Sequence, residues 1–206
     1  MKKLLTTAAL LATTVLSATP AMALPTLQID TNGHLMGATG VLINGSLYNV
    51  SFQDGTCSGL FGGCTNMLFK TLDDAKAAST ALLDQVFLND FDKHPEYTNG
   101  CSSLSTCGVI TPYDVRWSSN VNIYGQHWIT TMVGYAAINK GTDVHGKLIA
   151  DEMNGSSLSP NQNTNGATVQ TYAIWAPVPE PETYAMLLAG LGVMGAVARR
   201  RKTKQA

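Results

Sequence analysis

The 206-residue sequence is poor in charged residues and in the residue groupings that carry out catalysis or hold a metal ion. Asp, Glu, Lys and Arg make up 13% of the chain, about half of the usual share. The four histidines form no H-x-x-x-H or other close metal spacing, and the four cysteines form no C-x-x-C pair. We therefore expect no catalytic residues, no metal site and no cofactor, and the sequence favours a protein that is not an enzyme.

Basic residues are scarce in the middle of the chain. Of the 13 Lys and Arg residues, 7 lie in the segments 1–23 and 199–206. Residues 24–178 hold 6 basic and 12 acidic residues, a formal net charge of −6, although the value for the whole chain is −1. A body this acidic repels nucleic-acid phosphates, so we expect no nucleic-acid partner.

The first 23 residues have the three parts of a cleavable secretion signal. Two lysines follow Met1, residues 4–16 are uncharged and mostly apolar, and Ala21-Met22-Ala23 supplies the small residues that signal peptidase recognises. We expect signal peptidase to recognise Ala21 and Ala23 and to cut after Ala23. A short buried helix at the start of the domain is the alternative.

The cysteine count is even, with cysteines at positions 57, 64, 101 and 107. In an exported protein an even set indicates disulfides, and four cysteines allow three pairings. We favour Cys57–Cys64 and Cys101–Cys107, because each pair flanks a short loop rich in Gly or Ser. Closing loops of this length stabilises the fold by roughly 2–3 kcal/mol each. A zinc site is the alternative.

The C-terminal residues follow another three-part pattern. Residues 177–183 are a Pro-rich linker, residues 184–198 are uncharged and apolar, and residues 199–206 form a basic tail. We expect 184–198 to form a transmembrane helix of about 23 Å, short for a hydrocarbon core of roughly 30 Å. The basic tail should stay in the cytoplasm and leave the body outside. The prolines favour an extended linker that a protease can reach.

The run Val178-Pro179-Glu180-Pro181, the short apolar segment and the cluster Arg199-Arg200-Arg201 together closely resemble the PEP-CTERM sorting signal of Gram-negative bacteria. The resemblance implies that a membrane-embedded exosortase recognises Pro179, Glu180 and Pro181, cuts nearby and releases or transfers the body. It also implies an inner-membrane intermediate, a final place at the cell surface or outside the cell, and exopolysaccharide or surface proteins as partners. An anchor that is never cut is the alternative.

For the globular domain, residues 24–176, we expect an α+β or mainly β fold with antiparallel strands and one main helix. Asn44-Gly45 predicts a two-residue hairpin turn, followed by an alternating strand. Thr71 as a cap, with acidic residues in the first turn, predicts a helix at about 71–88. Further strands are predicted at residues 109–112, 115–117, 121–124, 127–138 and 168–175.

Three groupings in the body contain reactive residue types. Gly55-Thr56-Cys57-Ser58-Gly59 fits the G-x-C-x-G of a nucleophile elbow, but a Gly-rich loop is expected to follow it where a helix should begin. Asp143 and His145 could share a strand face, and the acids of residues 90–96 surround His94 and could bind calcium. Exposed acids and a paired cysteine are the more common explanations.

We therefore expect an exported, non-enzymatic protein of the cell surface or the extracellular matrix. An extracellular hydrolase whose site is not recognisable in the sequence is one alternative. A single-pass protein that stays uncut in the membrane is the other.

Overall fold

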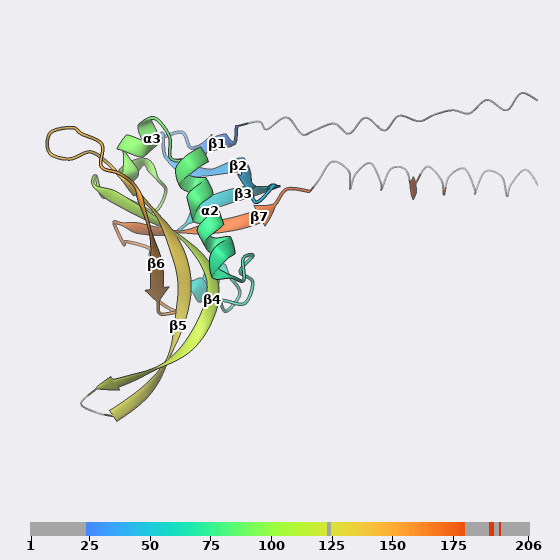
Figure 1. The fold of residues 1–206 in the computed structure, drawn as a ribbon, viewed down its shortest axis with the longest axis vertical. Helices are drawn as coiled ribbons and strands as arrows, with labels where there is room; N and C mark the ends of the chain where they lie inside the picture. The colour runs from blue at the N-terminus through green and yellow to red at the C-terminus, as the bar shows by residue number, and fades with distance from the viewer. Residues whose placement is uncertain (1–23, 123–124, 180–189, 192–193, 195–206) are drawn as a thin grey trace, which may run out of the picture.

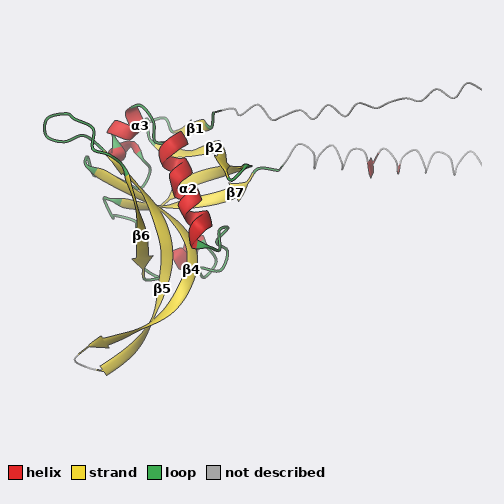
Figure 2. Cartoon of the chain, in the orientation of Figure 1, coloured by secondary structure: helices red, strands yellow, loops and turns green. Residues whose placement is uncertain are grey.

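Seven strands form one mixed sheet in a computed structural model that describes residues 24–122, 125–179, 190–191 and 194. The strands are β1 (Thr26–Ile29), β2 (Leu35–Ile43), β3 (Ser46–Gln53), β4 (Thr106–Asn122), β5 (Gly125–Lys140), β6 (Glu152–Leu158) and β7 (Gln170–Pro177). Their order in the sheet is β1-β2-β3-β7-β4-β5-β6 (Figure 1). The sheet dominates and helices are few, as the sequence predicted (Figure 2).

The helices are α1 (Cys57–Leu60), α2 (Leu72–Gln85), α3 (Asp90–Lys93) and the 3-10 helix η1 (Pro95–Tyr97). Only α2 is long, and it lies across one face of the sheet (Figure 1). The Thr71 side chain caps it by accepting a hydrogen bond from the Asp74 N–H, at 3.1 Å between N and Oγ1. The helix ends at Gln85, before the predicted end near residue 88, and the N–H groups of Val86 and Phe87 both donate to the Leu82 carbonyl oxygen there. The Gln85 side-chain amide binds both backbone groups of Leu42 on β2.

The hairpin between β2 and β3 forms at the predicted Asn44-Gly45 turn. Ile43 pairs with Ser46, so the loop has two residues. Both turn residues have positive φ, 49° at Asn44 and 85° at Gly45, which is the backbone that Asn-Gly favours.

Strands β4 and β5 are longer than the sequence predicted. The separate strands predicted at 109–112, 115–117 and 121–124 merge into β4, and β5 extends beyond the predicted 127–138 at both ends. A bulge between Pro112 and Asp114 absorbs the proline, so that pairing with β5 continues on both sides of it. The predicted break after residue 112 was wrong for that reason, and the predicted break at 118–120 was wrong because these residues pair with β5 in unbroken register. Residues 123–124 lie outside the described residues.

Two features of the sheet differ from the expected antiparallel arrangement. Strand β7 pairs antiparallel with β3, but parallel with β4 through Gly108–Ile110. Strands β1 and β6 lie at the two edges of the sheet and were not predicted. Both are mostly exposed, so they lack the apolar alternation that marks a half-buried strand.

The sheet buries a hydrophobic cluster on each face. Adjacent residues on a strand point to opposite faces, and Val109 and Ala173 lie in the cluster beneath α2 while their neighbours Ile110 and Tyr172 lie in the other. The second cluster is covered by the segment 57–67, which contributes Cys57, Phe61, Cys64 and Met67.

The structure pairs the cysteines as the loop lengths suggested. Cys57 is bonded to Cys64, with their Cα atoms 5.3 Å apart, and Cys101 to Cys107 at 5.8 Å. The Cys57–Cys64 bond lies within the segment that covers the second hydrophobic cluster. The Cys101–Cys107 bond links the loop after η1 to the start of β4.

Candidate functional site

The C-terminal end of the fold lies at the rim of the sheet beside the β2–β3 hairpin (Figure 1). Strand β7 is held between β3 and β4, and its last residue, Pro177, pairs with Tyr48. The next residue, Val178, donates its N–H to the Leu47 carbonyl oxygen, with 2.9 Å between N and O. Sheet pairing therefore holds the chain up to the residue before Pro179.

Most of the residues predicted to direct sorting lie outside the described residues. These are Ala21 and Ala23 of the secretion signal, Glu180 and Pro181, and Arg199, Arg200 and Arg201. The expected transmembrane helix at 184–198 also falls almost wholly outside them. In the part of the chain that is described, no helix is long and apolar enough to cross a membrane.

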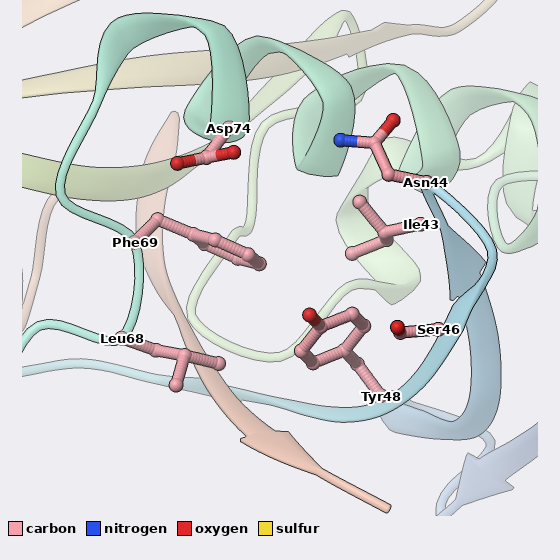
Figure 3. Close-up of a pocket in the computed structure, with 7 residues that line it drawn as sticks. All are labelled: Ile43, Asn44, Ser46, Tyr48, Leu68, Phe69 and Asp74. Atoms are coloured by element: carbon pink, nitrogen blue, oxygen red, sulfur yellow. The ribbon is translucent and has the colours of Figure 1, made fainter.

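A pocket of about 270 Å³ lies on the face of the sheet that carries α2, near the end of β7 (Figure 3). Three parts of the chain form it: the β2–β3 hairpin, the segment before α2 and the first turn of α2. The lining residues are Ile43, Asn44, Ser46, Tyr48, Leu68, Phe69 and Asp74.

The aromatic wall of the pocket is fixed by contacts behind it. The Tyr48 and Phe69 ring centroids are 5.6 Å apart, and Phe69 meets Trp175 edge to face at 5.8 Å. The Trp175 indole N–H donates to the Thr111 hydroxyl, at 3.1 Å between Nε1 and Oγ1. Because Phe69 and Trp175 are buried, the wall is held in one arrangement.

The polar groups of the pocket lie near the hairpin turn and at the start of α2. Asn44 and Ser46 are exposed, and the Asp74 carboxylate accepts a hydrogen bond from the Thr71 hydroxyl at 2.7 Å. The lining contains no histidine, cysteine or lysine, and its one carboxylate, Asp74, is hydrogen-bonded to Thr71 and not to a hydroxyl of the lining. An aromatic face beside amide, hydroxyl and carboxylate groups suits a polar ligand that has one apolar face.

Cys57 is not available as a nucleophile, because it is fully buried and bonded to Cys64. A helix does follow it, contrary to the expectation of a loop. Helix α1 begins at Cys57, and its cap Thr56 accepts a hydrogen bond from the Gly59 N–H. That helix has four residues and packs the disulfide against the sheet.

The Asp143 and His145 pair forms a turn. The Asp143 carboxylate oxygen Oδ1 accepts hydrogen bonds from the backbone N–H groups of His145 and Lys147, each at 2.9 Å. Asp143 therefore fixes its own loop, and the His145 side chain is exposed. In the described part of the chain, no hydroxyl side chain is hydrogen-bonded to Asp143 or His145, although a hydrolase would need that geometry.

The acids of residues 90–96 are spread around α3 and η1. The His94 ring nitrogen Nδ1 lies 3.0 Å from Glu96 Oε1, and the same ring stacks on Tyr97 with centroids 4.7 Å apart. Asp90 is 83% exposed and reaches Lys93 at only 4.0 Å. Among the described residues no three His, Cys, Asp or Glu side chains meet in a way that could hold a metal ion.

One partly buried carboxyl group was not singled out from the sequence. Asp54 follows β3, and its Oδ1 accepts a hydrogen bond from the Thr164 hydroxyl at 3.0 Å. Burial raises the pKa of Asp54, and the hydrogen bond from Thr164 opposes that shift. The same Thr164 hydroxyl accepts from the Gly55 N–H, so this network ties the loop before β7 to the end of β3.

A family model described as the PEP-CTERM protein-sorting motif matches residues 177–202. No curated protein and no solved structure matches the chain. The chain therefore carries a PEP-CTERM sorting motif, which begins at the last residue of β7 and supports export to the cell envelope with exosortase processing.

Proposed function

We propose that this chain is a non-enzymatic protein of the bacterial cell surface or extracellular matrix, delivered there by exosortase cleavage near Pro179-Glu180-Pro181. The observation that carries the proposal is the PEP-CTERM motif at residues 177–202. Signal peptidase would first remove residues 1–23, and residues 184–198 would then hold an inner-membrane intermediate with the basic tail in the cytoplasm. The two disulfides and the acidic body are consistent with a protein that resides outside the cytoplasm.

The position of the motif relative to the fold supports cleavage there. Among the described residues, the last hydrogen bond to the sheet is made by Val178, and Pro179 follows directly. An enzyme that binds from Pro179 onward therefore meets the chain directly after its last described contact with the sheet. Only the five residues 179–183 separate Val178 from the apolar segment, at most roughly 18 Å when extended. The cleavage site would thus lie close to the membrane surface.

Fractionation of cells that express the chain, with and without the exosortase, tests this proposal. We expect the body at the surface or in the medium when the enzyme is present, and in the inner-membrane fraction when it is absent. Replacing Pro179, Glu180 and Pro181 together by alanine should give the second distribution in both strains. A control with Asp143→Ala, which changes an acid in a turn of the body, should sort normally. The same surface distribution in both strains would contradict the proposal.

For the body, we propose that the pocket binds a sugar unit of an exopolysaccharide. The observation in favour is the aromatic wall of Tyr48 and Phe69 beside the Asn44 amide, the Ser46 hydroxyl and the Asp74 carboxylate. A sugar ring has an apolar face that stacks on aromatic rings and hydroxyl groups that bind amides and carboxylates. The pocket is slightly smaller than a typical site for a drug-sized ligand of about 300–1,000 Å³, which favours a single ring.

Tyr48→Ala should weaken retention of the protein on polysaccharide from the producing strain by about tenfold, since it removes about 1–1.5 kcal/mol of ring contact. Affinity electrophoresis in a gel that contains the polysaccharide measures this. Tyr97→Ala is the matched control, because Tyr97 is 39% exposed and does not line the pocket. Equal retardation of Tyr48→Ala and the unmodified protein would rule out the pocket as the sugar site.

A further inference from the structure

Strands β4 and β5 continue past the rest of the sheet as a two-stranded ribbon. They pair with each other from Thr106 opposite Lys140 to Asn122 opposite Gly125. Strand β7 pairs with β4 only through Gly108–Ile110, and β6 pairs with β5 only from Met132 to Ile138. We call residues 116–122 and 125–131 the ribbon. Figures 1 and 2 show it curving away from the sheet and from α2.

Both edges of the ribbon lack a partner strand among the described residues. Its seven residues on each strand span about 23 Å at roughly 3.3 Å per residue. A two-stranded ribbon on its own is marginally stable in water, and each open edge presents unpaired N–H and C=O groups. We therefore expect a further strand to pair with at least one edge of the ribbon.

The ribbon also lacks the devices that keep strand edges from pairing. Residues 116–131 contain no lysine, no proline and no acidic residue. Their one arginine, Arg116, is neutralised by Asp114, with 2.9 Å between Nε and Oδ2. The bulge of β4 lies before the ribbon, between Pro112 and Asp114. Nothing in this segment would repel an approaching strand.

The first two residues of the ribbon on β4 are exposed. Trp117 is 72% exposed, although tryptophan is usually largely buried, and its neighbour Arg116 is also exposed. Opposite them on β5, Thr130 and Thr131 are partly buried. Strand β4 has no pairing with β7 beyond Ile110, whereas β5 is paired with β6 from Met132 onward, so β4 offers the longer unpaired edge.

We propose that the β4 edges of two copies of this chain pair antiparallel about a two-fold axis, joining the two sheets through their ribbons. An antiparallel edge is complementary to its own copy, because each N–H meets a C=O when the second strand runs in the opposite direction. The body carries a net charge of −6 over residues 24–178, so two bodies repel each other. The ribbon projects from the body and is nearly neutral, so two copies can make contact there with the least electrostatic repulsion.

Light scattering after size-exclusion chromatography of the full chain in a mild detergent tests this pairing. We expect two chains per particle at high concentration and one on dilution. Trp117→Lys should give one chain per particle, because like charges would face each other across the two-fold axis. Ser119→Pro should do the same by removing an N–H from β4. Val144→Lys is the matched control, since Val144 is 95% exposed in the turn after β5, and it should leave the dimer intact.

Hydrogen exchange gives a second readout that does not depend on a variant. Among residues 116–122, the backbone N–H groups that point away from β5 should exchange at least tenfold more slowly in the concentrated sample than in the dilute one. One chain per particle at every concentration would overturn the proposal, as would a dimer that persists in Trp117→Lys. A dimer that is lost equally in Val144→Lys would place the contact elsewhere and would also overturn it.

Discussion

Replacing both Cys57 and Cys64 by serine should lower the free energy of unfolding of the folded body by about 3–5 kcal/mol. Roughly 2–3 kcal/mol of this comes from freeing a closed loop in the unfolded chain. The rest arises because both sulfur atoms are buried against the second hydrophobic cluster, Cys57 at 0% and Cys64 at 4% exposure. Two serine hydroxyls at these positions would lose their hydrogen bonds to water on folding, and no protein group is placed there to replace them.

Urea unfolding of residues 24–179, followed by tryptophan fluorescence, measures this loss. The Cys101→Ser/Cys107→Ser variant is the comparison, since its loop is of similar length and should lose roughly 2–3 kcal/mol from closure, with a burial cost only at the fully buried Cys107. Reductant should lower the unfolding midpoint of the unmodified body and leave a variant without cysteines unchanged. A loss below about 0.5 kcal/mol in Cys57→Ser/Cys64→Ser would mean that the bond contributes little. A body that needs its disulfides is best folded after export.

Phe52→Ala should cost about 3–5 kcal/mol of unfolding free energy. Phe52 lies on β3 with no exposed surface and stacks on Phe87, with ring centroids 5.8 Å apart. It pairs with Ala173 on β7, so the cavity that alanine leaves would open between the centre of the sheet and the segment that follows α2. Neither neighbour is free to fill it, because both are fixed by their own packing.

Urea unfolding measures the loss in Phe52→Ala, with Leu104→Ala as the matched control. Leu104 is 74% exposed and should change stability by less than about 0.5 kcal/mol. A similar small change in Phe52→Ala would show that the region around β3 collapses around the missing ring, contrary to a rigid core. If Phe52→Ala and Leu104→Ala lost unfolding free energy to the same extent, the losses would indicate an effect on the unfolded chain.

The features that could be predicted from the sequence depend on residues close together in the chain. The Asn44-Gly45 turn requires only two residues with positive φ, and the start of α2 depends on Thr71 and the acids just after it. Each disulfide closes a loop of six or seven positions. The sorting motif is likewise a continuous segment, at residues 177–202.

The features that could not be predicted depend on distant or exposed residues. Strand β6 is mostly polar and pairs at the edge, so it lacks an apolar period. The parallel contact of β4 with β7 joins Gly108 to Gln170, and no local pattern records a crossover of that length. The pocket is formed from residues 43–48, 68–69 and 74, whose side chains meet only in the fold. Tyr48 lies in the alternating strand that the sequence predicts, which gives no indication of a pocket. No pattern in the sequence marks Phe69 as a pocket residue.

The reactive groupings of the sequence failed as sites for physical reasons that the structure makes visible. Cys57 bonds to Cys64, and Asp143 satisfies the N–H groups of its own turn. His94 pairs with Glu96 and stacks on Tyr97. In each case the side chain that would have reacted or bound a ligand is already bonded to, or packed against, a residue nearby in the chain. The proposed role at the cell surface therefore rests on the sorting segment, the disulfide-closed body and its pocket.

The intact mass of the protein recovered from the outer surface of producing cells tests the proposed sorting most directly. We expect a chain that begins at Leu24 and ends between Pro179 and Thr183, with the apolar segment 184–198 and the basic tail removed. A small covalent addition at the new C-terminus would fit transfer to a surface component. A surface form whose mass extends to Ala206 would contradict cleavage and leave the chain as an uncut membrane-anchored protein.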